Sequence, residues 1–156
     1  MYINEDVENL NADDLNIDDD ISLVFIEYSA TTGFTAERYV IYPNRLLYYS
    51  YGKRNEDIIS NPACFERIEN SKYTVLSDKD FEAIMSYADM INLDVSNSDR
   101  LMQQGNFRYF ITHNYKYREF TRFELKEDFE FYIEGNEHML DILEILEKYF
   151  VSSYRE

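Results

Sequence analysis

Residues 21–51 read ISLVFIEYSATTGFTAERYVIYPNRLLYYSY, and this stretch decides the fold class. β-Branched and aromatic residues, which favour strands, are concentrated in three runs: 21–30, 36–42 and 45–51. Gly33 lies between the first two runs and Pro43-Asn44 between the last two, and these residues are typical of turns. We therefore predict an antiparallel meander of three strands.

Two amphipathic helices are predicted further along the chain. Ser77 is a suitable N-cap for a helix that reaches about Leu93, because acidic residues follow it and apolar residues then recur with helical spacing. A second helix is predicted over about 136–150. Its broad stripe of leucine, isoleucine and methionine indicates a buried face.

The remaining segments complete the predicted fold. We predict a hairpin over 107–113 and 117–125 and a short edge strand over 129–133. The segment 53–71 has no regular pattern, so we predict a long surface loop there. The order βββα–ββ(β)α is typical of an α+β domain with one antiparallel sheet of about five to six strands and both helices packed on one face. The other face would then be open and would carry many of the tyrosines.

Charge is the most unusual property of the chain. Its 156 residues include 31 Asp and Glu but only 15 Lys and Arg, which gives a formal net charge of −16. Residues 1–20 hold eight acids and no base, so we predict an acidic N-terminal arm there, followed by a single α+β domain over 21–156. This charge opposes direct binding to nucleic acid or to anionic membranes. Since no apolar run suits a membrane span and the start does not read as a signal peptide, we expect a cytoplasmic protein.

Motifs for catalysis are not found in the sequence. The four glycines are scattered and form no phosphate-binding loop, and GxSxG, HExxH and CxxC patterns are missing. Cys64 is the only cysteine, so a zinc site with several thiolates is excluded, and His113 and His138 lie far apart in sequence. We expect no enzyme activity, no cofactor and no metal site. A nucleophilic pair of Cys64 with His113 is the enzymatic alternative.

Tyrosine supports a binding function. The chain has 15 tyrosines and no tryptophan, and tyrosine is enriched at recognition surfaces. Together with the negative charge, this predicts a small acidic protein that inhibits or neutralises a basic protein partner. An immunity protein, an antitoxin or a phage-encoded anti-defence inhibitor has this character, and the favoured partner is a nuclease or another nucleic-acid-binding enzyme.

Two other functions stay open at this point. The chain could be a ligand-binding or regulatory module with a pocket between sheet and helices, or a structural subunit of a larger assembly. The sequence does not determine the oligomeric state. Affinity that falls steeply with salt would favour the inhibitor over a buried pocket.

The predicted partner-binding residues are acids and tyrosines in the arm and beside the aromatic strands. They are Asp18, Asp19, Asp20, Glu27, Glu37, Tyr49, Tyr51, Asp57, Glu66 and Glu69.

Overall fold

The computed structural model describes residues 21–29, 34–56, 65–93, 107–114, 116–121, 124–129, 132–152 and 154. The predicted arm at 1–20, the turn at Gly33, Asp57 and Cys64 lie outside these residues.

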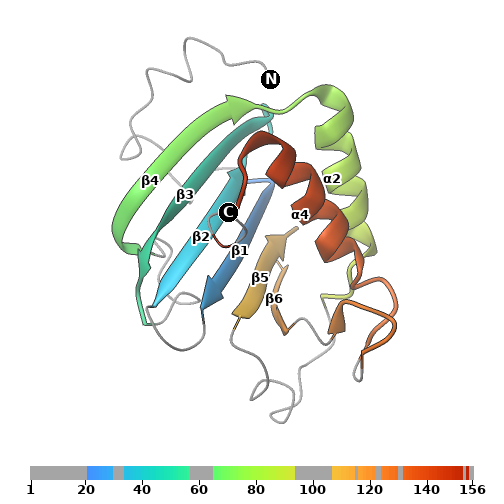
Figure 1. The fold of residues 1–156 in the computed structure, drawn as a ribbon. Coiled ribbons are helices and arrows are strands. Elements are labelled where there is room, and N and C mark those ends of the chain that lie inside the picture. The colour runs from blue at the N-terminus through green and yellow to red at the C-terminus, as the bar shows by residue number, and fades with distance from the viewer. Residues whose placement is uncertain are drawn as a thin grey trace.

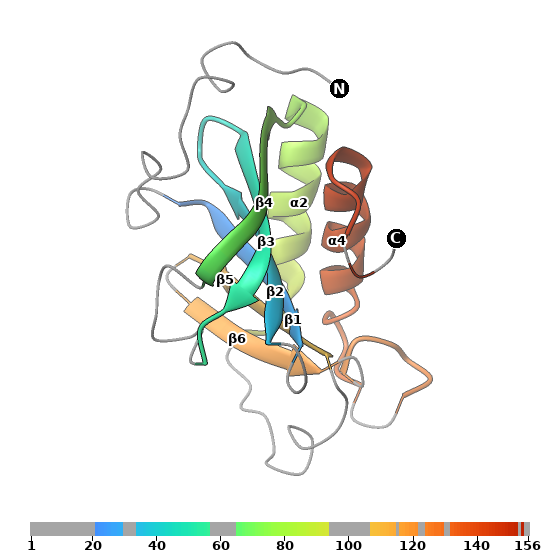
Figure 2. The same cartoon turned by 60° about the vertical axis from the view of Figure 1, so that its left-hand side comes forward.

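The described residues form a six-stranded antiparallel sheet with the strand order β4-β3-β2-β1-β5-β6 (Figure 1). The strands are β1 (Leu23–Ser29), β2 (Thr35–Ile41), β3 (Leu46–Arg54), β4 (Phe65–Val75), β5 (Phe107–His113) and β6 (Lys116–Thr121). The helices α2 (Asp78–Met90) and α4 (His138–Tyr149) lie side by side on one face of the sheet (Figure 2). The predicted α+β class, the antiparallel sheet and the packing of both helices on one face are confirmed.

The hydrophobic core lies between the helices and the sheet face that they cover. Side chains alternate along a strand, so Phe25, Tyr39 and Leu47 from three neighbouring strands share this face and are fully buried. Ile84 of α2 and Leu146 of α4 meet them from the helical side and are also fully buried. The meander and the two helices are thus held together by a single apolar layer.

Strand β4 corrects the prediction of a surface loop over 53–71. It pairs with β3 and forms one edge of the sheet. Residues 66–72 are all exposed. Because neither face of this segment is buried, its sequence shows no alternation between apolar and polar residues. The register also shifts twice along this pair, as β-bulges do. Bulges and charged side chains on an edge strand disfavour pairing with another sheet.

We predict that Gly52→Ala destabilises the β3–β4 pair. A Cβ atom at Gly52 would lie 2.1 Å from the backbone oxygen of Arg67, so the bulged strand would have to move away. Overpacking of this kind costs about 1–3 kcal/mol, to be measured by urea unfolding. The exposed helical substitution Ser86→Ala is the control, and equal stability of both variants would contradict the close approach.

The second hairpin is shorter than predicted. Strand β6 is Lys116–Thr121 and does not reach Leu125, because Glu124 and Leu125 have left the extended conformation and the Glu124 carboxylate accepts a hydrogen bond from the Thr121 N–H (3.1 Å). The predicted edge strand over 129–133 is also wrong: the described residues of that range are a bend and irregular chain.

The helix ends differ slightly from the prediction. Helix α2 ends at Met90 because Ile91 adopts extended backbone angles. Helix α4 begins at His138, after a turn in which Gly135 has a φ of 96°. No helix in the described ranges is both long and apolar enough to span a membrane.

The face of the sheet away from the helices is largely covered, so the prediction of an open face is wrong. Val40 and Ser50 on this face are completely buried. A small apolar cluster accounts for part of the burial, and it consists of Ile26, Tyr28, Ala36, Phe65 and Phe110. The guanidinium of Arg38 lies 5.2 Å from the centre of the Phe65 ring, where a long side chain of this type shields apolar surface. Tyr117, at the β6 edge, does remain exposed.

Candidate functional site

Charge differs between the two layers of the fold. The six strands contain eight Lys and Arg against five Glu, a net charge of +3. The two helices contain seven Asp and Glu against two Lys, a net charge of −5. The helical layer is therefore more acidic than the strands.

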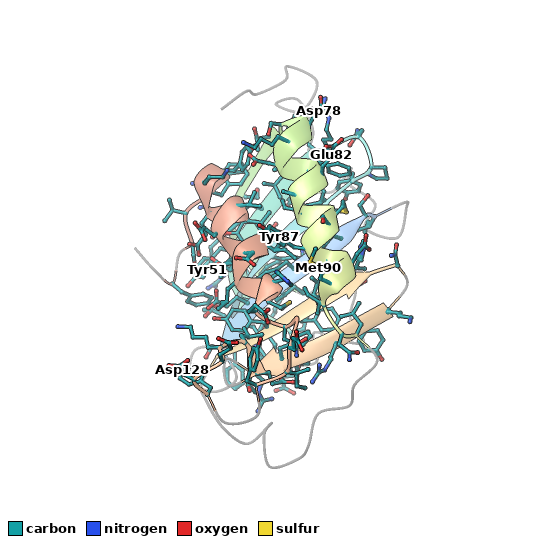
Figure 3. The ribbon with its side chains drawn as sticks, turned by 90° about the vertical axis from the view of Figure 1, so that its right-hand side faces the viewer. Tyr51, Asp78, Glu82, Tyr87, Met90 and Asp128 are labelled. Carbon is teal, nitrogen blue, oxygen red and sulfur yellow. The ribbon has the colours of Figure 1, made fainter. Side chains whose placement is uncertain are left out.

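The acids of the helices project away from the core. Burial of Ile84 and Ala88 fixes the rotation of α2, and burial of Met139 and Leu146 fixes that of α4, so the polar stripes of both helices face outward. Figure 3 looks onto this side. We call its outward acids the acidic helical face, which consists of Asp78, Glu82, Asp89, Asp141, Glu144 and Glu147.

Polar contacts between the helices hold this face in one arrangement. The Asp80 carboxylate accepts hydrogen bonds from Tyr149 (2.6 Å) and from Lys148 (3.1 Å). The Tyr149 hydroxyl also accepts a hydrogen bond from the backbone N–H of Ser77 (3.1 Å). The start of α2 is thus fastened to the end of α4.

We predict that Tyr149→Phe raises the pKa of Asp80. Partial burial acts to raise this pKa, but the hydrogen bonds from Tyr149 and Lys148 outweigh it and hold the pKa below its ordinary value. A lowered carboxyl pKa gives stability that is present above the unfolded pKa and is lost as pH falls through the folded one. NMR titration of the Asp80 carboxyl should give a higher pKa in the variant than in the wild type. The variant should also lose less stability than the wild type as the pH falls. An unchanged Asp80 titration would show that the hydroxyl contributes nothing.

Apolar groups lie among these acids at the end of α2. Met90 is 53% exposed and ends the helix, close to the labelled Tyr87 (Figure 3). The Tyr87 ring stacks on His138 of α4 with a centroid separation of 5.2 Å, and His138 Nδ1 is 2.9 Å from a carboxylate oxygen of Asp141. An exposed methionine and an aromatic ring surrounded by charged groups are typical of protein recognition surfaces.

The structure places Glu27 and Glu37 directly opposite each other in the β1–β2 register. Both are buried, at 3% and 0% exposure, on the side of the sheet that faces the helices. Tyr49 is also buried, and its hydroxyl donates a hydrogen bond to Glu37 (3.1 Å). These three residues were predicted on a partner-binding surface, and their burial in the sheet excludes them from it.

Two further tyrosines lie close to this carboxylate pair. The Tyr154 hydroxyl is 2.9 Å from Thr35 Oγ1, and its ring packs edge-on against Tyr51 at 5.8 Å. Burial raises the pKa of Tyr154, and the nearby charges of Tyr51, Glu37 and Glu27 add to that rise. Chemically, the paired carboxylates can accept hydrogen bonds from hydroxyl or cationic groups, as Tyr49 illustrates.

The other predicted site residues do not join one surface. Glu66 and Glu69 lie on strand β4 at the sheet edge, where Glu66 pairs with Lys53 (3.5 Å) and Glu69 with Arg67 (2.8 Å). Tyr51 is half-buried beside the carboxylate pair. The predicted acids at positions 18, 19, 20 and 57 are outside the described ranges.

Histidine and acidic residues of the described ranges are the candidate ligands of a metal ion. Within them, no three His, Cys, Asp or Glu residues lie close enough to hold a metal ion. His113 has a structural position: its Nε2 is 2.8 Å from Asp89 of α2 and its Nδ1 is 3.1 Å from the Ser22 carbonyl. The alternative pair with Cys64 involves a residue that the structure does not describe.

Comparison with protein-family models and with curated proteins finds no match to this chain. The acids of the two helices are candidate site residues that were not among the predicted ones. Their signal was available, because each helix pairs a strong apolar stripe with a polar stripe that is mostly acidic.

Proposed function

We propose that this chain is a small acidic binding protein that neutralises a basic protein partner, and that the acidic helical face is its binding surface. The observation that carries the proposal is the division of charge between a helical layer of net −5 and strands of net +3. A nuclease or another nucleic-acid-binding enzyme is the partner class, because such enzymes present basic surfaces to phosphates.

The layout of the helical face suits this role. The two helices pack side by side and present their outward carboxylates together, so the exposed ones can occupy the positions that phosphates take on the partner. Complementary charge speeds association and disfavours other partners. Met90 and Tyr87 add apolar contact area beside the charges, at the end of α2, and such side chains are frequent in protein interfaces.

Affinity capture at two salt concentrations tests this proposal. The full chain is immobilised on a support and incubated with native extract at about 0.1 M and at about 1 M salt. Between these concentrations the Debye length falls from about 10 Å to about 3 Å. We expect one basic protein that is retained only at low salt and whose enzymatic activity falls when the purified chain is added. A captured protein whose activity is unaffected would contradict neutralisation.

A ligand-binding module is the second candidate, and the Glu27–Glu37 pair favours it. These buried carboxylates face the helical layer, where a ligand would lie between sheet and helices. Binding there would depend weakly on salt. A thermal-shift screen of small cationic and hydroxylated compounds distinguishes the two candidates, since only the module is stabilised by such a compound.

A further inference from the structure

A row of polar residues crosses the sheet on the face away from the helices. Arg38 of β2 is opposite Ser50 of β3, and Ser50 is in turn opposite Ser71 of β4. Residues opposite one another in neighbouring strands share a face, with Cβ atoms about 4.5–5.5 Å apart. Arg38 and Ser50 are buried and Ser71 is exposed, so the row leads from the middle of the sheet to solvent at its edge.

Two buried hydroxyl groups in this region lack hydrogen bonds. Neither Ser50 Oγ nor the Tyr48 hydroxyl has a hydrogen-bond partner within the ranges that the structure describes, and both residues are at most 2% exposed. Leaving such a group unsatisfied is unfavourable, and buried groups of this kind call for an explanation. The two residues flank the same cation: Arg38 is opposite Ser50 in the register, and its Cζ lies 6.0 Å from the centre of the Tyr48 ring.

We propose that Arg38, Ser50 and Ser71, with Tyr48 beside them, form a binding site for an oxyanion of the phosphate type. A guanidinium matches the geometry of two phosphate oxygens, and hydroxyl groups donate hydrogen bonds to the remaining ones. The Phe65 ring, 5.2 Å from Arg38 Cζ, restricts the orientation of the guanidinium.

The net charge of −16 does not prevent anion binding at this site. The acidic helical face lies on the opposite side of the sheet, so the sheet separates its carboxylates from the site, whereas the guanidinium of Arg38 lies at the site itself. The proposal is also independent of the partner-binding function, since it uses different residues on the other face.

Thermal unfolding of the full chain with inorganic phosphate tests the site. Sodium chloride of equal ionic strength corrects for general salt effects, and the variants are Ser50→Ala, Ser71→Ala and the helical control Ser86→Ala. We expect a saturable rise in the unfolding temperature of the wild type and of the control. Ser50→Ala should bind phosphate about tenfold more weakly, as expected for the loss of one hydrogen bond to a charged group. Without phosphate it should be at least as stable as the wild type, because an unsatisfied buried hydroxyl has been removed.

Other outcomes would overturn the site. One such outcome is that Ser50→Ala is less stable than the wild type without phosphate and that neither the wild type nor any variant responds to phosphate. The Ser50 hydroxyl would then be hydrogen-bonded to the chain or to water. An equal phosphate response in wild type and Ser50→Ala would place the anion elsewhere. Amide NMR shifts on phosphate addition provide a second measurement, and they should be confined to β2, β3 and β4.

Discussion

Arg118→Met is expected to lower the free energy of unfolding by about 3–5 kcal/mol, the usual cost of leaving one partner of a buried ion pair alone. The side chains of Arg118 and Glu124 are 5% and 0% exposed, and they are hydrogen-bonded to each other. Arg118 also donates to the Asn92 carbonyl (3.2 Å) and lies over the Phe120 ring. Removing it leaves the Glu124 carboxylate buried without its cation, next to the end of α2.

The pH dependence of this variant provides a check on the cause. Burial raises the pKa of Glu124 even beside Arg118, and loss of the cation must raise it further. A carboxyl whose folded pKa is raised favours the folded state at low pH and loses that advantage as pH rises. Arg118→Met should therefore be closest to the wild type in stability in acid and furthest from it above neutral pH.

A matched surface pair serves as the control for Arg118→Met. Arg67 and Glu69 are 2.8 Å apart, but their side chains are 69% and 46% exposed. Since exposed pairs contribute about 0–1 kcal/mol, Arg67→Met should have little effect. Similar losses in the two variants, measured by urea unfolding, would refute the special role of burial.

Charge reversal on the helices has the second large effect. We expect the double variant Glu82→Lys/Glu144→Lys to bind the basic partner at least about 100-fold more weakly, because like charges brought together at an interface cost several kcal/mol. Both residues are exposed, one on each helix, so the fold should be retained. The measurement is the dissociation constant for the captured partner, by surface plasmon resonance at fixed salt.

The double variant Glu66→Lys/Glu69→Lys is the matched control. It changes the net charge by the same amount, but on strand β4 at the sheet edge. We expect a reduction of less than about tenfold, mainly through slower association, because only the long-range field is altered. Equal effects of the two variants would show that overall charge, and not the helical face, governs binding.

The fold was largely predictable because most elements have a clear hydrophobic period. Strands β1, β2 and β3 are dense in β-branched and aromatic residues, and the apolar stripes of the helices recur at helical spacing. Strand β4 was not predictable in the same way, since its stability comes from pairing with β3 and seven of its side chains are exposed. The hydrogen bond of Glu124 to the Thr121 N–H at the end of β6 is also a contact that sequence periodicity does not reveal.

The candidate site differs from the predicted partner-binding residues. Glu27 and Glu37 were chosen as surface acids, although alternation places Glu27 on the same face as Leu23 and Phe25, and Glu37 on the same face as Tyr39. That pattern pointed to burial. A charged residue beside aromatic strands was taken as a sign of recognition, while the acidic stripes of the helices received no weight.

The most direct test of the proposed function is hydrogen–deuterium exchange of the chain with and without its captured basic partner. The proposal predicts added protection in α2 and α4, concentrated around Tyr87, Met90 and Glu144, and unchanged exchange in β4. Protection confined to β4 or to the sheet face away from the helices would contradict it.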